Sequence, residues 1–260
     1  GEPLVRKNCD VLVRKLHHIK GIESITLTTN GVLLSKHIEE LVESGMDAVN
    51  ISLDAMDSDK FMTITKGNHW NDIMDGIQRA LEYPSLRIKI NCVPIRGINE
   101  EDLIKIAELA KENPIHVRFI EMMPIGIGRE FSFLPEEEVR IILERKLGVL
   151  QPVSDHLGNG PAHYFKVEGY KGRIGFISAR THKFCENCNR IRLTSDGFLK
   201  TCLQFNSGYD LKKALRDSSS DKAIEAIIKK ALSEKPDCHV FDTMADQDTV
   251  ENRGMNDIGG

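Results

Sequence analysis

The chain has 260 residues, of which 40% are hydrophobic and 28% charged, which is enough apolar material for one good core and a smaller second one. Its formal net charge of -4 gives no reason to expect a nucleic-acid or membrane partner. No apolar run has the length that spans a bilayer, so we expect a cytoplasmic protein, in which six cysteines are typical of thiols or metal ligands rather than disulfides.

Helical and strand patterns alternate over the first 123 residues. Apolar spacing predicts helices over 9–19, 37–42, 73–81 and 102–110, and strands over 24–28, 48–53, 87–93 and 117–121. Strands separated by helices indicate parallel βαβ units with right-handed crossovers. Four strands are too few for a closed barrel, so the pattern predicts an α/β fold built as a partial, incomplete β/α TIM-type barrel.

Each predicted strand ends in a polar or glycine-containing segment. In β/α barrels the chemistry lies at the carboxyl ends of the strands, so these segments are expected to face the active site. Within the third strand, Lys89 lies between Ile88 and Ile90 and therefore faces the opposite side from them. Inside a barrel this cation needs an anionic partner, whereas on an edge strand it faces solvent.

The character of the chain changes after Pro124. A loop leads to a predicted helix over 136–146, then to a β-hairpin over 162–167 and 173–178, and later to helices over 211–215 and 223–232. The segment 242–260 is polar. We therefore predict a partial barrel domain over 1–124 and a C-terminal region over 125–260.

Three cysteines form the sharpest chemical signal, with the spacing Cys185-x2-Cys188-x13-Cys202. Two thiolates three residues apart can bind one metal centre, and a third can arrive from the end of a following hairpin; zinc and iron–sulfur clusters both suit such ligands. Structural zinc normally takes four protein ligands, and the nearest further candidate, His182, is only three residues before Cys185. Three cysteines on a 4Fe–4S cluster leave one iron free for a substrate. The spacing alone leaves zinc and cluster open.

Two arginines follow the cysteine pair directly. In an extended segment Arg190 and Arg192 point to the same side, and their guanidinium groups suit phosphate oxygens. A solvated strand face with ion pairs is the alternative interpretation.

The chain resembles the molybdenum-cofactor GTP 3′,8-cyclase family of radical S-adenosylmethionine (SAM) enzymes over essentially all 260 residues. The resemblance rests on ordered motifs: Gly1-Glu-Pro-Leu, Leu27-Thr-Thr-Asn-Gly31, Asn50-Ile-Ser-Leu-Asp54, Lys89-Ile-Asn-Cys-Val93, Arg96-Gly97, Arg118-Phe-Ile-Glu-Met-Met-Pro124, Phe184-Cys-x2-Cys-Asn-Arg-Ile-Arg192, Thr194-x-Asp-Gly-x-Leu-x-x-Cys-Leu203 and Ile258-Gly-Gly260. It implies a radical SAM partial barrel with a C-terminal iron–sulfur-binding extension.

The resemblance also implies the reaction, in which one cluster cleaves SAM and a second cluster holds GTP during its rearrangement to (8S)-3′,8-cyclo-7,8-dihydroguanosine 5′-triphosphate. Position by position, it assigns Gly1, Glu2, Ser52 and Met123 to SAM; Thr28, Lys89, Arg118, Arg190 and Arg192 to GTP; and Cys185, Cys188 and Cys202 to the second 4Fe–4S cluster. Gly259 and Gly260 correspond to a catalytic tail that enters the active site, where residues without side chains can approach the substrate. A cyclic pyranopterin synthase is the expected downstream partner, and a homodimer is left open.

The chain departs from the family in one respect. The CxxxCxxC motif that resemblance assigns to the SAM-cleaving cluster does not occur among its six cysteines. We therefore expect an N-terminally incomplete polypeptide that holds one cluster, with a second in the complete protein, and that lacks activity alone. Two other functions remain as alternatives: a radical SAM peptide-modifying enzyme with an auxiliary cluster, and a non-catalytic zinc-binding module.

Overall fold

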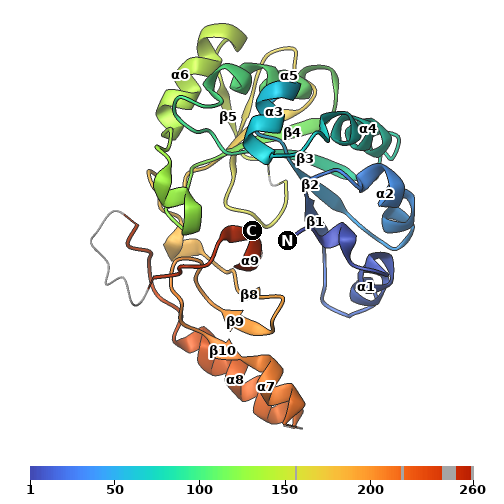
Figure 1. Cartoon of the computed structure of the whole chain (residues 1–260), viewed down its shortest axis with the longest axis vertical. Coiled ribbons are helices and arrows are strands. Elements are labelled where there is room, and N and C mark those ends of the chain that lie inside the picture. Colours follow the sequence, from blue (N-terminus) through green and yellow to red (C-terminus); the bar gives the residue numbers. More distant parts are fainter. Residues whose placement is uncertain (156, 218–219, 242–249, 259–260) are drawn as a thin grey trace. The chain divides into compact units, whose positions relative to one another are not determined.

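A seven-stranded, mostly parallel sheet is formed by strands that lie between residues 26 and 177 (Figure 1). It is seen in a computed structural model that describes all residues except 156, 218–219, 242–249 and 259–260. The strands are β1 (Thr26–Thr29), β2 (Ala48–Ser52), β3 (Arg87–Cys92), β4 (Ile115–Ile120), β5 (Gln151–Val153), β6 (His163–Lys166) and β7 (Arg173–Ile177). Their order is β1-β2-β3-β4-β7-β6-β5, so within the described residues the sheet has two ends and is not closed.

The register of the sheet is parallel from β1 through β4 to β7, and antiparallel only where β6 and β5 extend it. The four predicted parallel strands are confirmed. The predicted hairpin is also confirmed, but its second strand pairs with β4 as well and so adds a fifth parallel strand to the barrel-like sheet. The fold is therefore the predicted partial barrel.

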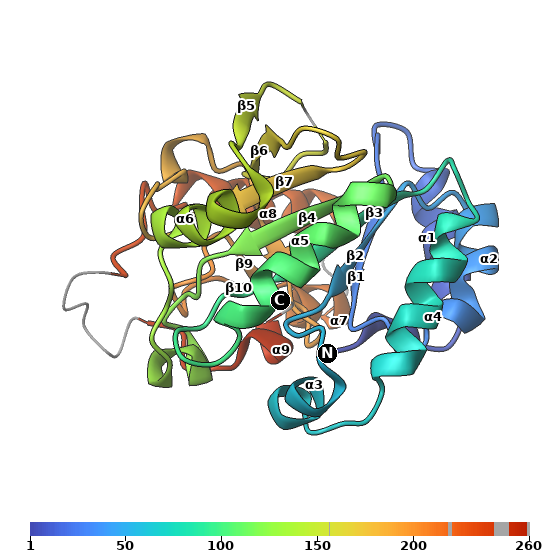
Figure 2. The same cartoon turned by 90° about the horizontal axis from the view of Figure 1, so that it is seen from above.

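Helices cover one face of this sheet, as the two views show (Figures 1 and 2). They are α1 (Cys9–His17), α2 (Leu34–Glu43), α3 (Ser58–Thr65), α4 (Trp70–Leu81), α5 (Leu103–Glu112) and α6 (Glu136–Leu147), with short 3-10 turns η1 (Pro3–Val5) and η2 (Glu100–Asp102). A further 3-10 turn, η3 (Gly126–Glu130), lies between β4 and α6 in the chain. Of the helices, α3 has no counterpart among the predicted elements. Alternate strand residues such as Ile51, Ile90 and Val117 are fully buried in the hydrophobic core that these helices enclose.

A smaller sheet carries the C-terminal part of the chain. Its strands β8 (Arg192–Leu193), β9 (Phe198–Lys200) and β10 (Tyr209–Asp210) are antiparallel, and η4 (Cys185–Asn187) precedes them. Helices α7 (Leu211–Arg216) and α8 (Asp221–Ser233) pack on β9 around a second small core, and α9 (Met255–Ile258) follows. The predicted helices over 211–215 and 223–232 are confirmed.

The chain divides into two compact units. One comprises residues 2–122 and 133–178, and the other comprises Gly1, 123–132 and 179–260. Residues 133–178 share a unit with the partial barrel because β7 pairs along the whole of β4, so the units divide the chain differently from the predicted boundary at 124, which stays a prediction. Among the described residues, no helix is long and apolar enough to cross a membrane.

Candidate active site

Polar side chains occupy the face of the large sheet that the helices leave uncovered. The strand register aligns them in two rows, because paired residues of neighbouring strands share a face. One row runs Thr28, Asn50, Lys89, His116 and Arg173; the next runs Ser52, Asn91, Arg118 and Gly175. The predicted residues Thr28, Ser52, Lys89 and Arg118 therefore all lie on one face of one compact unit.

Lys89 is the central cation of this face. Its side chain is only 5% exposed and points away from Ile88 and Ile90, as the alternation predicts. No described residue accepts a hydrogen bond from its ammonium group or forms an ion pair with it. Burial, together with the positive charges of Arg118 and Arg87, lowers the pKa of Lys89 to about 8. A buried cation without an acceptor favours an anionic ligand.

Arg118 lies on the neighbouring strand and is fixed by two partners. Its Nε donates a hydrogen bond to Asn91 Oδ1 at 2.8 Å, and Tyr164 of β6 is a second side-chain partner. Burial lowers the pKa of Arg118 from its ordinary value, against the effect of Tyr164. Neither partner is a carboxylate, so these two contacts supply no counter-ion for the guanidinium.

A loop between β5 and β6 lies against this pair of cations. A Cβ atom at Gly158 would be 2.9 Å from Lys89 Nζ, and one at Gly160 would be 4.0 Å from an Arg118 guanidinium nitrogen. The carbonyl oxygen of Leu157 accepts a hydrogen bond from Arg87 at 3.5 Å. Glycines allow the loop backbone to approach the cations closely.

The same face carries buried polar atoms that lack partners among the described residues. Asn50 Nδ2 donates to Thr28 Oγ1 at 3.0 Å, but Asn50 Oδ1 is buried with no partner, and so is His116 Nδ1. Burial, reinforced by the positive charge of Lys89, lowers the pKa of His116 to about 4, so its ring is neutral. The unpaired Asn50 oxygen requires a hydrogen-bond donor, so these atoms fit a polar ligand that donates hydrogen bonds on this face.

Glu2 is held at the carboxyl end of β1. Its carboxylate accepts hydrogen bonds from the Leu4 amide at 3.0 Å, from Thr29 Oγ1 at 2.7 Å and from the Asn30 amide at 2.7 Å. These contacts place the glutamate of the Gly-Glu-Pro motif beside the Thr-Thr-Asn-Gly turn. Ser52 is exposed at the end of β2.

The three predicted metal-ligand cysteines lie in the other compact unit. Cys185 begins η4, the amide of Cys188 donates to the Cys185 carbonyl at 3.0 Å, and Cys202 follows β9. All three are half-buried free thiols. Among the described residues, no three His, Cys, Asp or Glu side chains lie close enough together to hold a single metal ion.

Lys235, just beyond the end of α8, joins the cysteine segments. Its ammonium donates to the carbonyl of Arg190 at 2.8 Å and to that of Thr201 at 2.6 Å, and it lies 3.7 Å from Cys188 Sγ. Burial opposes ionisation of Cys188, but the Arg190 amide, Lys235 and the Arg190 guanidinium together lower the pKa of this thiol. The thiolate form that cluster iron requires is therefore favoured here.

The two predicted arginines flank these cysteines. The Arg190 guanidinium lies 4.0 Å from Cys188 Sγ and 5.2 Å from the ring centre of Phe184. Burial lowers the pKa of Arg192, while the charges of Cys188 and Cys202 raise it, which shows that Arg192 is near both sulfurs. The three cysteine thiols lie near the cations Lys235, Arg190 and Arg192. This set of residues fits the negatively charged cluster that the sequence predicts. Gly259 and Gly260 lie outside the described residues.

Sequence reasoning missed several residues of these two sites. Asn50 and Asn91 could have been found from strand alternation, since each shares a face with a predicted residue two positions away. Lys235 and Tyr164 carry no local signal, because only the tertiary fold brings them to Cys188 and Arg118.

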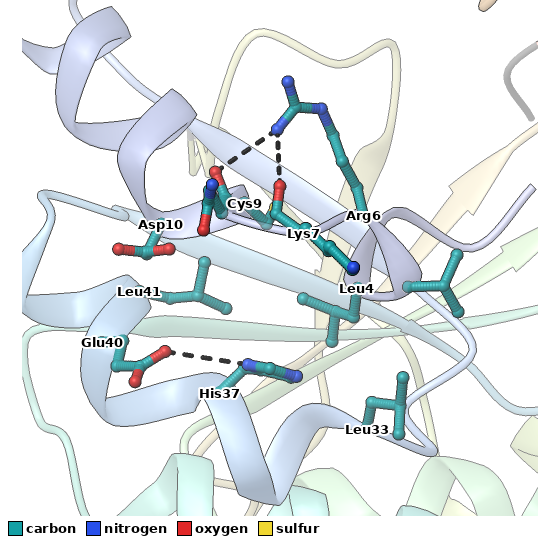
Figure 3. Close-up of a pocket in the computed structure, with 11 residues that line it drawn as sticks. Leu4, Arg6, Lys7, Cys9, Asp10, Leu33, His37, Glu40 and Leu41 are labelled. Atoms are coloured by element: carbon teal, nitrogen blue, oxygen red, sulfur yellow. Dashed lines mark hydrogen bonds and ion pairs between the residues drawn. The ribbon is translucent and has the colours of Figure 1, made fainter.

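A pocket of about 640 Å³ lies elsewhere, between η1, α1 and α2 (Figure 3). His37 and Glu40 form an ion pair at 3.8 Å on one wall, and Cys9 lines the pocket with a thiol whose pKa burial raises. It contains none of the predicted site residues.

The chain matches two family models: the radical SAM superfamily over residues 1–110 and Molybdenum Cofactor Synthesis C over residues 115–241. A GTP 3′,8-cyclase from Clostridium perfringens (strain 13 / Type A) is 42% identical over 260 residues, which are 100% of this chain and 80% of that protein. A GTP 3′,8-cyclase from Pelotomaculum thermopropionicum is 40% identical over 264 residues, with the same coverage. Molybdenum cofactor biosynthesis protein 1 of Dictyostelium discoideum is 35% identical over 92% of this chain and 39% of that protein. Among solved structures, a radical SAM methyltransferase from Sphaerobacter thermophilus has a TM-score of 0.46 and 22% identity, covering 56% of this chain and 46% of the other, which is too low to support a conclusion.

Proposed function

The chain belongs to the GTP 3′,8-cyclase family, and we propose that it performs the reaction of that family, the conversion of GTP to (8S)-3′,8-cyclo-7,8-dihydroguanosine 5′-triphosphate in molybdenum cofactor biosynthesis. The observation that carries this function to the chain's own residues is the largely buried side chain of Lys89 beside Arg118, whose ammonium has no acceptor among the described residues. A triphosphate supplies the negative charge that these two cations lack.

Cys185, Cys188 and Cys202 are the residues that would hold one 4Fe–4S cluster. The radical SAM family model, matched over residues 1–110, implies a 4Fe–4S cluster together with SAM, and these cofactors supply the electron and the radical chemistry. The three cysteines lie outside that range, so the cluster proposed on them is supported by their spacing and by the cations around them. Lys235 and Arg190 lower the pKa of the Cys188 thiol and offset the negative charge of the ligand set.

The remaining assigned residues bind and orient. Glu2, together with Gly1, Ser52 and Met123, binds SAM, for which the Glu2 carboxylate is already oriented by Thr29 and Asn30. Lys89, Arg118, Arg190 and Arg192 bind the phosphate chain of GTP, and Thr28 offers a hydroxyl at the end of β1. Gly259 and Gly260 enter the active site as the catalytic tail. The product passes to a cyclic pyranopterin synthase, and the protein works in the cytoplasm, with a homodimer as the proposed assembly.

GTP binding by the Lys89→Met variant tests this function. The reconstituted protein is titrated with GTP by calorimetry, and the variant should bind on the order of 10–100-fold more weakly because it loses a charge-assisted phosphate contact. Lys166→Met is the matched control, since Lys166 lies exposed on β6 of the same sheet. Equal affinity of the Lys89→Met and control variants would reject the assigned role of Lys89, and the absence of GTP binding by the unmodified protein would reject the function.

A further inference from the structure

The segment 250–254, which leads into α9, is held by a buried ionic network. Glu251 is 2% exposed, and its carboxylate accepts from the fully buried ammonium of Lys200 and from Arg253 Nε and Nη2 at 3.1 and 3.0 Å. Lys200 Nζ also donates to the Phe205 carbonyl at 2.7 Å. Burying two opposite charges contributes little to stability by itself, but it fixes the geometry of the groups that carry them.

Backbone contacts hold the same segment to the residues after β9, where Cys202 lies. The Glu251 amide donates to the Gln204 carbonyl at 2.6 Å, and Val250 forms an isolated β-bridge with Phe205. Lys200, Cys202 and Gln204 are alternate residues of one short segment. Any displacement of residues 250 and 251 is therefore transmitted directly to the residues around Cys202.

A second clamp comes from the loop after Met123. Arg129 donates from Nη2 to the Glu251 carbonyl at 2.9 Å, from Nη1 to Asn252 Oδ1 at 3.3 Å, and from Nε to the Pro124 carbonyl at 3.2 Å. Gly126 approaches so closely that a Cβ atom there would be 2.9 Å from Gly254 Cα. One guanidinium thus bridges the loop that follows Met123 and the segment that precedes α9.

We propose that Lys200, Glu251 and Arg129 are positioning residues that fix α9 relative to Cys202 and Met123. This inference rests on the proposed function, in which Gly259 and Gly260 act in the reaction. Four residues separate Gly254 from Gly259, and Ile258 is fully buried. A shift of the network would therefore displace α9, while the cluster ligands and the GTP-binding residues themselves stay unchanged in chemistry.

Two variants separate positioning from folding. Arg129→Met removes the clamp at an exposed side chain and leaves no buried charge behind. The double variant K200M/E251L replaces the buried ion pair by apolar groups, a change that is often neutral for stability. Arg253 loses its contact with Glu251 in this variant but keeps its ion pair with Asp196 at 3.7 Å. Glu225→Gln is the matched control, because Glu225 is exposed on α8 and pairs only with Lys229 among the described residues.

The experiment uses the reconstituted protein, including any residues that precede Gly1 in its gene. Iron content, GTP affinity, kcat and the hydrogen exchange of residues 255–258 are measured for each variant. We expect kcat to fall roughly tenfold or more and exchange at 255–258 to rise roughly tenfold in both test variants, with iron content, KM for GTP and the control unchanged.

The inference is overturned if kcat per cluster stays at the unmodified level, or if iron content falls in proportion to activity, because the network would then serve folding alone. Unchanged hydrogen exchange at 255–258 in both variants overturns it equally. If hydrogen exchange at 255–258 rises in the variants as expected but the unmodified protein never converts GTP, the proposed function is rejected, while the anchoring of α9 stays supported.

Discussion

The ammonium of Lys89 has lost most of its water without gaining an acceptor among the described residues. Its pKa of about 8 follows first from burial and then from the charges of Arg118 and Arg87. Burial disfavours the charged ammonium of Lys89 in the free protein. A bound anion stabilises that charge and raises the pKa of Lys89 again. The side chain therefore couples ligand binding to proton uptake.

The pH dependence of GTP affinity is the first consequence at this scale. Below pH 8 Lys89 carries its proton in the free protein, whereas above pH 8 binding must recruit one. The affinity for GTP should therefore fall as pH rises, by up to about tenfold per unit above pH 8. Calorimetry from pH 6.5 to 9.5 measures this slope. The Lys89→Met variant should lack it, and an equal slope in the variant would contradict the prediction.

Asp54, two residues after β2, is a second group whose charged form is disfavoured by burial, here a carboxylate instead of an ammonium. Burial raises the pKa of its carboxyl to about 6, although the Val93 amide, which donates to it at 2.8 Å, acts to lower it. The folded protein therefore holds this proton longer than the unfolded chain between pH 3.8 and 6. Stability falls as pH rises through that window, and the full penalty applies above it.

Asp54→Asn keeps an acceptor for the Val93 amide and removes the ionisation. We expect the variant to be more stable than the unmodified protein by about 1–2 kcal/mol at pH 7 and nearly equal at pH 3.5. Urea unfolding at both pH values measures the difference. The exposed Asp237→Asn serves as control, and a loss of stability at pH 7 in the Asp54 variant would show that the charge itself is used in the fold.

At the scale of elements, the docking of β7 on β4 completes the polar face. Gly172 precedes β7, and its amide donates to the Ala110 carbonyl at 2.8 Å. A Cβ atom at this position would be 1.8 Å from the carbonyl oxygen of Ile115, at the start of β4. The close approach of two backbones here requires a residue without a side chain.

Gly172→Ala should therefore destabilise the protein by about 1–3 kcal/mol, because the backbone must move to relieve the overlap. Gly67→Ala is the matched control, since its Cβ would meet only the flexible side chain of His69, at 3.1 Å. Equilibrium urea unfolding compares the two. Equal free energies of unfolding would mean that β7 can shift on β4 without cost.

At the scale of the whole molecule, the six cysteines divide by environment. Cys92 is buried and Cys238 exposed, whereas Cys9, Cys185, Cys188 and Cys202 are half-buried. Cys188 and Cys202 are set apart from Cys9 by Lys235, which contacts both the Cys188 sulfur and the Thr201 carbonyl beside Cys202. The chain spans 80% of the length of the two cyclases described above.

Reconstitution of these 260 residues with iron and sulfide should therefore give about four irons per chain, the content of one 4Fe–4S cluster. Cys188→Ser should lose most of this iron, whereas Cys238→Ser should retain it. Iron and acid-labile sulfide analysis under anaerobic conditions provides the count. A content near eight irons would contradict the assignment of a single cluster, and a colourless zinc protein would contradict the cluster itself.

Much of the fold could be read from local patterns. The strands over 48–53 and 87–93 and the helix over 136–146 are found nearly as predicted, because apolar alternation and helical spacing record which face of an element is buried. The face occupied by Lys89 also followed from its two isoleucine neighbours. The family followed from ordered motifs, and the relatives confirm it. The individual roles of the site residues stay predictions.

Only the tertiary structure decided the rest. The parallel pairing of β7 with β4, the contact of Lys235 with Cys188 across 47 residues, and the ion pair of Lys200 with Glu251 across 51 residues join distant segments. Short-range periodicity reports burial of a face but not the identity of the partner that covers it. A lone lysine or glutamate in sequence resembles any solvated charge, and it becomes part of a site only when the fold removes its water and supplies, or withholds, a counter-charge.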